Sequence, residues 1–173
     1  MEQNVWLTDA VGRAGTDPST IVRSFASAGR HCDDPVAART KLLLALPAEV
    51  LPHWLDDLYR HGDAGEKLAV LTALPELPIG DEAVPLLHDA IRTNDTRLLA
   101  AALGPYARRL DQHAWRHAVL KCVFLAVPLS EVADLDDRAD RELTEMLAAL
   151  RAEREAAGRR LPPDALRLLD PIP

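Results

Sequence analysis

Residues 62–74 read GDAGEKLAVLTAL and residues 94–103 read NDTRLLAAAL, and these two stretches decide the fold class. In both, a carboxylate stands just before a run of apolar residues spaced three and four apart, which is the spacing of one face of an α-helix. In the first stretch, Asp63 and Glu66 have the Asp-x-x-Glu spacing of a capping box, which satisfies free N–H groups of a first helical turn. A shift of 32 residues superposes Asp63 on Asp95. Two similar helix starts at this spacing indicate a helical repeat.

Asp, Pro and Gly residues mark further helix boundaries on both sides of these stretches. No segment shows the alternation of apolar and polar residues that is typical of a strand. Ala (28 residues) and Leu (29) make up a third of the chain, whereas Val and Ile total 15, which favours helix over sheet. The predicted helices cover residues 4–13, 17–28, 34–46, 48–60, 63–74, 80–91, 94–103, 111–124 and 138–157, followed by a short turn at 164–169 and a loosely packed tail, Pro171-Ile172-Pro173.

These segments predict an all-α fold of about 9–10 helices, in which antiparallel helix pairs stack as a short HEAT-like right-handed solenoid or as a compact helical array. The length of 173 residues suits one domain over residues 1–173, with the helices of residues 3–32 packed on the remainder.

The acidic charge balance excludes two classes of partner. The chain carries 20 Lys and Arg against 27 Asp and Glu, for a net charge of −7 and a pI near 5.3. Such a surface repels phosphate backbones and anionic lipids, so we expect no nucleic-acid partner and no membrane insertion. The sequence has neither the start of a signal peptide nor a run of about 20 apolar residues that would span a bilayer. We therefore expect a cytoplasmic protein.

An imidazole and two carboxylates gather around the start of the predicted helix at residues 63–74. His61 as acid and Asp63 as base would transfer protons if burial tuned their pKa values, and Glu66 would contact a ligand there. Helix capping explains the same two carboxylates without any chemistry. Capping is the favoured interpretation, and the proton-transfer site is the alternative.

A second polar string precedes the predicted helix at residues 94–103. The densest run of hydrogen-bonding side chains in the sequence consists of Arg92, Thr93, Asn94, Asp95 and Arg97. An Asp–Arg ladder that ties successive repeats together is one interpretation. A pocket for an anion or a polyol is the other, with Arg92 and Asn94 holding the ligand and Asp95 acting as base.

Lys121 lies inside an otherwise apolar run, residues 118–127. Its charged end must therefore extend to solvent, pair with an acceptor or serve a function. A lysine whose pKa is lowered by burial is a candidate acid, base or Schiff-base nucleophile. A carboxylate partner at the edge of the core is the more common outcome. Trp115, on the same predicted helix, would line the same ligand pocket.

His113 and His117 have the four-residue spacing that lets two imidazoles share a metal. A zinc site needs at least one more protein ligand, and Ala114 stands where the glutamate of a His-Glu-x-x-His signature would be. We therefore expect no metal and no cofactor.

The order of several short strings resembles the EboA-domain family over about residues 36–163. The strings are Tyr59-Arg60-His61-Gly62-Asp63, Glu66 to Pro75 (EKLAVLTALP), Arg92-Thr93-Asn94-Asp95, Ala114-Trp115-Arg116, Val119-Leu120-Lys121, Pro128-Leu129, Leu135-Asp136-Asp137-Arg138-Ala139, Met146-Leu147 and the end Glu153-Arg154 with Ala157-Gly158-Arg159. The sequence departs from the commoner pattern at Val127, where a small Gly-like residue is expected, and at Asp134 and Asp140, where Gly and Asn are more usual.

The resemblance implies a small cytosolic protein from bacterial or cyanobacterial secondary-metabolite clusters. Such clusters also supply a metal-dependent hydrolase, a prenyltransferase, a dehydroquinate-synthase-like cyclase and a sugar-phosphate-isomerase-like protein. Their products resemble prenylated cyclitols or, in cyanobacteria, support export of a pigment precursor.

Two functional hypotheses follow from the residues and the resemblance together. The first is an accessory helical-repeat protein that binds a polar cyclitol-like or prenylated intermediate, another enzyme of the cluster, or both. The second is a cofactor-independent isomerase, lyase or cyclase in which Asp95 or Asp63 is the base, Lys121 or His61 the acid, and Arg92 the anchor. A homodimer is left open by the sequence.

Overall fold

The structure, a computed structural model, describes residues 2–169, with side chains from Val5 onward. Those residues form eleven α-helices, four short 3-10 helices and no strand, so the all-α prediction is confirmed. The predicted loose tail Pro171-Ile172-Pro173 lies outside the described residues. The elements are α1 Glu2–Thr16, η1 Pro18–Thr20, α2 Ile21–His31, α3 Pro35–Leu44, α4 Leu51–His61, α5 Ala64–Ala73, η2 Leu74–Glu76, α6 Val84–Arg92, α7 Thr96–Ala102, η3 Pro105–Arg109, α8 Gln112–Leu125, η4 Leu129–Glu131, α9 Leu135–Arg138, α10 Arg141–Ala156 and α11 Pro163–Arg167.

The chain divides into two compact units, residues 1–89 and residues 90–173, and the division falls within α6. Each unit has its own buried apolar interior. A single domain over residues 1–173 and a right-handed HEAT-like solenoid stay predictions.

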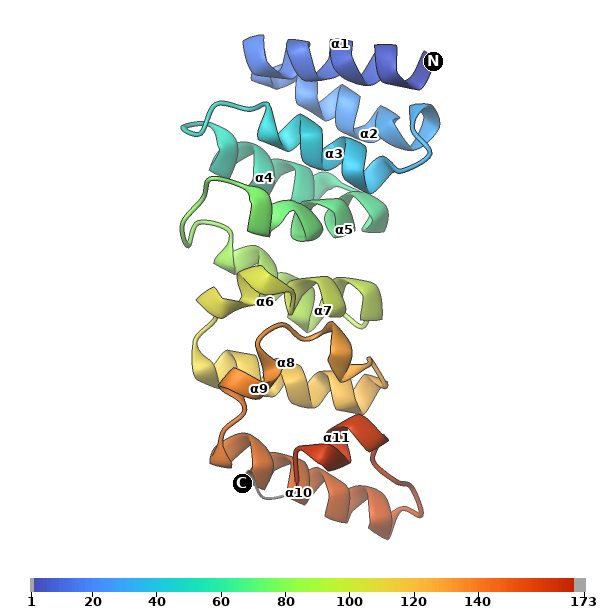
Figure 1. Cartoon of the computed structure of the whole chain (residues 1–173), viewed down its shortest axis with the longest axis vertical. Helices are drawn as coiled ribbons and strands as arrows, with labels where there is room; N and C mark the ends of the chain where they lie inside the picture. The colour runs from blue at the N-terminus through green and yellow to red at the C-terminus, as the bar shows by residue number, and fades with distance from the viewer. Residues whose placement is uncertain (1, 170–173) are drawn as a thin grey trace. The chain divides into compact units, whose positions relative to one another are not determined.

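In the first unit, consecutive helices from α1 to α5 run in opposite directions (Figure 1). The helix α3 packs against α1, α2 and α5, and α4 packs against α5. Phe25 of α2, Leu42 of α3 and Leu55 of α4 are almost completely buried. Burial of side chains of this size contributes about 1.5–3 kcal/mol each to folding. The apolar stripes seen in the sequence therefore face one another here.

In the second unit, the 14-residue helix α8 packs against α7, α10 and η4. Its buried face carries Trp115, Val119 and Cys122, and burial raises the pKa of the Cys122 thiol to about 12. Leu147 of α10 is also fully buried. Many elements around α8 are short, since α7 has seven residues and α9 has four. Short helices leave many terminal carbonyl groups for the rest of the unit to satisfy.

The helix starts follow the sequence punctuation closely. A side-chain oxygen of a capping aspartate accepts a backbone N–H at the start of η1, α3, α5, α7, α8 and α10, from Asp17, Asp34, Asp63, Asp95, Asp111 and Asp140 respectively. Several boundaries differ from the prediction: α1 and α2 end at Thr16 and His31 rather than near residues 13 and 28, and α4 begins at Leu51 rather than near residue 48. The helix α6 begins at Val84, three residues after Asp81, and the predicted helix from Arg138 is interrupted by a break at which Asp140 caps α10.

Candidate functional site

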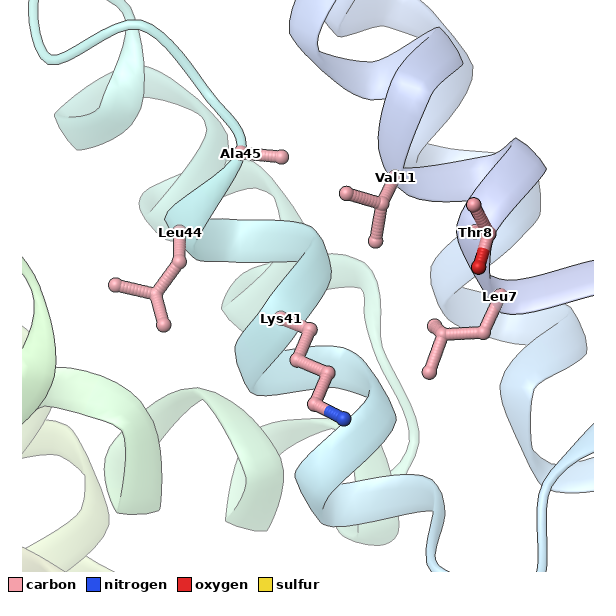
Figure 2. A pocket seen from close by; sticks show the side chains of 6 residues that line it. All are labelled: Leu7, Thr8, Val11, Lys41, Leu44 and Ala45. Atoms are coloured by element: carbon pink, nitrogen blue, oxygen red, sulfur yellow. The ribbon is translucent and has the colours of Figure 1, made fainter. Parts of the chain in front are cut away.

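A groove opens between α1 and α3 in the first unit, and Figure 2 shows its lining. Its volume is about 440 Å³, within the range of pockets that accept small molecules. In Figure 2 the side chains of Leu7 and Val11 point from α1 toward α3, while Lys41 reaches from α3 into the space between the helices. We refer to this site as the α1–α3 groove; its lining residues are Leu7, Thr8, Val11, Lys41, Leu44 and Ala45.

The α1–α3 groove was missed by the sequence analysis. Its residues have the types expected on any amphipathic helix, so nothing in the sequence separates them from core positions. Leu44 is the informative exception, because this leucine stays 45% exposed within a helix whose Leu42 and Leu43 are fully buried. The run of three leucines at residues 42–44 was the only signal, since one face of a helix cannot bury all three.

Arg39 of α3 is the charged residue buried most deeply among those described, with 6% of its surface exposed. Its Nε donates to the carbonyl oxygen of Phe25 (3.0 Å), its guanidinium lies 5.3 Å from the centre of the Phe25 ring, and Glu66 Oε1 is 3.9 Å from its terminal nitrogen. Sequence reasoning did not single out Arg39. These contacts tie α2, α3 and α5 together, which is a structural task.

The predicted proton-transfer group around His61 is arranged as a helix cap. Asp63 accepts the backbone N–H of Glu66, and Glu66 accepts that of Asp63, each at 2.8 Å. The His61 ring is 77% exposed, and its Nδ1 lies 3.2 Å from a carboxylate oxygen of Asp57. The capping interpretation of Asp63 and Glu66 is confirmed. No described pocket brings His61 and Asp63 together around a substrate; their catalytic roles stay a prediction.

In the second unit, the Asp95 carboxylate is already engaged. It caps α7 by accepting the Arg97 N–H at 3.0 Å, and it forms a two-pronged ion pair with the Arg97 guanidinium at 3.1 and 2.7 Å. The side-chain hydrogen bond from Arg97 holds the pKa of Asp95 below its ordinary value. A carboxylate with a lowered pKa is a weaker base. Arg92 and Asn94, predicted to bind a ligand beside it, are exposed.

The Lys121 side chain contacts the backbone at the end of α6, in the segment that also contains Arg92 and Asn94. Its Nζ donates to the carbonyl oxygens of Ile91 at 2.6 Å and Thr93 at 2.7 Å. A cation at the carbonyl end of a helix is favoured by both hydrogen bonding and the helix dipole. The expected partner was a carboxylate, but the observed partners of Lys121 are two backbone carbonyl groups.

Trp115, the other predicted ligand contact, is fully buried six residues before Lys121 on α8. The guanidinium of Arg138 lies 4.7 Å from the centre of its indole ring. Arg138 also donates to the carbonyl oxygens of Ala107 (2.8 Å) and Leu110 (2.9 Å), and partial burial lowers its pKa. Within the described residues, the indole Nε1 has no hydrogen-bond partner. Trp115 thus lies in the core, beneath Arg138.

A polar network that the sequence did not reveal joins α8 to the start of α10. Arg116 binds Asp140 through two nitrogens, at 2.9 and 2.6 Å, and pairs with Glu142 at 2.8 Å. The Gln112 side chain donates to Asp140 at 3.1 Å. Hydrogen bonding from Arg116 is the largest cause of the strongly lowered pKa of Asp140. This network fixes the angle at which α10 begins.

The second unit also contains the His113–His117 pair, considered above as metal ligands, and the Pro128 loop, where the sequence departs from the EboA pattern. The His113 and His117 rings meet edge to face with centres 4.4 Å apart, and the described residues contain no group of three His, Cys, Asp or Glu side chains that could hold a metal. A pocket of about 480 Å³ lies beside the Pro128 loop, and Asp134 lines it with left-handed backbone (φ 56°). Aspartate tolerates this conformation, for which glycine is the usual residue.

No helix within residues 2–169 is both long and apolar enough to cross a membrane. No curated protein and no solved structure matches the chain. The family model described as "Metabolite traffic protein EboA" matches residues 20–170, which include every helix from α2 to α11. Because that match covers most of the sequence, and because it agrees with the resemblance carried by residues 36–163, the chain belongs to the EboA family.

Proposed function

We propose that the chain is an accessory protein that binds a metabolic intermediate in the α1–α3 groove and does not transform it. The groove is the observation that carries this proposal: four apolar side chains line it, and Thr8 and Lys41 supply a hydroxyl and an ammonium. A mostly apolar lining with a few polar groups is typical of small-molecule sites. The family's description, metabolite traffic, supports a metabolite-associated role.

The lining favours a prenylated intermediate over an unmodified cyclitol. Leu7 and Val11 offer carbon surface to a hydrocarbon chain, and each buried CH₂ group contributes about 0.8 kcal/mol to binding. A bare polyol would lose hydration there without enough polar partners to replace it. Lys41 is exposed, so its ammonium suits a carboxylate or phosphate at the polar end of the ligand.

The state of the predicted catalytic residues supports binding rather than catalysis. Asp95 is occupied by Arg97, and Lys121 by two carbonyl oxygens. An acid–base enzyme needs both groups to be available to a substrate. The α1 wall of the groove precedes the family match, while the α3 wall lies within it. Delivery of the bound ligand to another enzyme of the pathway, in the cytoplasm, completes the proposal.

A displacement assay tests the site. The fluorescent anion 8-anilinonaphthalene-1-sulfonate serves as the probe because it joins an aromatic body to one negative charge, and farnesol, farnesyl phosphate and inositol serve as competitors. We expect farnesyl phosphate to compete best, farnesol less well and inositol not at all. In Lys41→Gln, the advantage of farnesyl phosphate over farnesol should fall by about two- to threefold, because the lost ion pair is at an exposed lysine.

Matched variants separate the groove from general surface binding. Val11→Trp fills the groove and should abolish the probe binding that farnesol displaces, whereas Val22→Trp places the same side chain at a position on α2 that is 45% exposed and should not. Lys67→Gln is the charge control for Lys41→Gln. Unchanged probe binding in Val11→Trp, or competition by inositol equal to that of farnesol, would overturn the proposal.

A further inference from the structure

A second pocket lies in the second unit, where α10 ends and the chain turns back toward α11. Its volume is about 530 Å³. We call it the arginine pocket; its principal lining residues are Arg151, Glu155, Arg159, Arg160, Leu161 and Leu166. None of these residues belongs to the α1–α3 groove or to the predicted catalytic set.

The turn that ends α10 accounts for the placement of two of these arginines. Gly158 adopts left-handed backbone, with φ of 71°, and its N–H donates to the carbonyl oxygen of Glu155 at 3.0 Å. The N–H of Arg159 donates to the carbonyl oxygen of Arg154 at 2.7 Å. This pair of bonds is a Schellman motif, which ends a helix sharply. Arg159 and Arg160 therefore follow directly on a fixed helix end.

The charges in the arginine pocket are unbalanced. Arg151 pairs with Glu155 through Nε at 2.8 Å, one turn along α10. The side chains of Arg159 and Arg160 have no hydrogen-bond or ion-pair partner within residues 2–169. Among the described lining residues, three guanidinium groups thus share one pocket with one carboxylate, in a chain whose net charge is −7. Like charges in one pocket repel one another, and an anion would relieve that repulsion.

The side chains that line the arginine pocket indicate which class of ligand it would bind. Guanidinium groups bind phosphate oxygens through paired N–H donors, and a phosphate monoester carries about −1.5 to −2 charges at neutral pH. That charge matches the excess of two cations over carboxylates in the pocket. Leu161 is buried and Leu166 is 38% exposed, so the pocket also offers apolar surface beside the arginines.

From this arrangement we propose that the arginine pocket binds a small organic phosphate, with the phosphate group held by Arg159 and Arg160 and an apolar substituent against Leu166. Arg151 contributes its terminal nitrogens while Glu155 holds its Nε. The site is separate from the α1–α3 groove, and it stands or falls independently of the function proposed for that groove.

Calorimetric titration of the full chain with phenyl phosphate and with inorganic pyrophosphate tests the proposal. Both should bind, and Arg159→Gln/Arg160→Gln should lose at least about tenfold in affinity, as expected for the loss of two charge-assisted contacts. Because those side chains have no partner within residues 2–169, the unfolding midpoint of this variant should match that of the unmodified protein. Leu166→Ser should weaken phenyl phosphate while leaving pyrophosphate unchanged.

The helix α10 supplies matched controls. Arg141 pairs with Glu145 at 2.7 Å in the same geometry as Arg151 with Glu155, but it lies at the other end of α10, outside the pocket. Arg151→Gln should therefore weaken binding several-fold and Arg141→Gln should not. Glu155→Gln removes the one carboxylate among the described lining residues and should strengthen binding, whereas Glu145→Gln should leave it unchanged.

Several outcomes would overturn the proposal. Binding that survives in Arg159→Gln/Arg160→Gln, or falls equally in Arg141→Gln, would place the phosphate elsewhere on the surface. Weaker binding in Glu155→Gln would contradict the charge argument. Co-sedimentation with phosphatidylcholine vesicles that contain phosphatidic acid tests whether the recognised phosphate belongs to a lipid. If those vesicles bind in an Arg160-dependent way while phenyl phosphate does not bind, the phosphate recognised belongs to a lipid surface and the small-molecule site is excluded.

Discussion

The two units of the chain satisfy their helix ends in different ways. In the first unit helices α1 to α5 have ten to fifteen residues, and the carbonyl oxygen to which the buried cation Arg39 donates, that of Phe25, lies inside α2 rather than at its end. In the second unit, helices as short as four residues are joined by cations from distant segments. Lys121 and Arg138 each donate to two carbonyl oxygens, and Arg154 donates to that of Phe124.

Helix length explains this difference. Every α-helix leaves four carbonyl groups without an internal partner, so a unit built from short helices has more of them for each residue it contains. Cationic side chains from elsewhere supply the missing donors in the second unit. The sequence suggests Lys121 as a candidate catalytic residue, but its ammonium group is already hydrogen-bonded to two backbone carbonyl oxygens. The candidate binding sites lie at other positions, in the α1–α3 groove and in the arginine pocket.

The largest expected effect comes from Arg138, which makes the most contacts of these cations. In Arg138→Met, the carbonyl groups of Ala107 and Leu110 lose their charged donor and Trp115 loses the cation over its ring. We expect the free energy of unfolding to fall by about 3 kcal/mol in urea denaturation, since a hydrogen bond to a charged group contributes about 1.5–3 kcal/mol. Arg108→Met, at an exposed position of η3, should change it by less than about 0.5 kcal/mol. Equal losses in the two variants would contradict the comparison of the units.

Lys121→Met tests the same idea at the end of α6. The variant keeps the apolar stem but removes two short hydrogen bonds and a favourable charge near the helix dipole. We expect a loss of about 2 kcal/mol in the free energy of unfolding. Lys41→Met, at an exposed position of the first unit, is the matched control and should lose almost nothing. If Lys121→Met is as stable as the unmodified protein, the two carbonyl contacts do not explain Lys121 and a functional role regains support.

Asp140→Asn gives a smaller effect that depends on pH. Asparagine still caps α10, but the charged pair with Arg116 is lost, and we expect a loss of about 1 kcal/mol near neutral pH. The pKa of Asp140 is lowered in the folded protein, chiefly by hydrogen bonding from Arg116. Its contribution is therefore complete above the unfolded pKa of about 3.9 and is lost as the pH falls toward the lower folded value. The difference between variant and unmodified protein should shrink below about pH 4.

The control for this pH series is Asp34→Asn, because Asp34 caps α3 in the first unit and has no arginine partner within residues 2–169. Urea denaturation at a series of pH values measures both variants. A stability difference for Asp140→Asn that stays constant down to the lowest pH would show that the charge of Asp140 contributes nothing to the fold.

How much the sequence could predict depends on the distance between interacting residues. The capping box of Asp63 and Glu66 and the caps at Asp95 and Asp111 are local, and the sequence predicts them because both partners lie within one turn. The partners of Lys121 and Arg138 lie 28–31 residues away, and no pattern within a helix indicates them. The end of α8 lies within one residue of the prediction, at Leu125, although Ala126 takes the left-handed position (φ 58°) at which glycine is the usual signal.

The sequence did not indicate the two candidate binding sites, because they also depend on contacts between distant segments. Whether Leu44 is buried or lines a groove depends on how α1 covers α3, which the amphipathic pattern of either helix leaves undetermined. Arg159 and Arg160 form part of an ordinary charged helix end in the sequence. Only the return of the chain through Leu161 and Leu166 makes them the wall of a pocket.

The smallest expected effect is that of Asp95→Asn, the residue that an acid–base mechanism would depend on most. Asparagine keeps the cap of α7, and the lost partner, Arg97, is 63% exposed. An exposed ion pair contributes little, so the free energy of unfolding should change by about 0.5 kcal/mol or less. Farnesyl phosphate should displace the fluorescent probe from the α1–α3 groove as before, because Asp95 does not line it. A variant that folds normally but no longer binds the probe would move the ligand site from the first unit to the second.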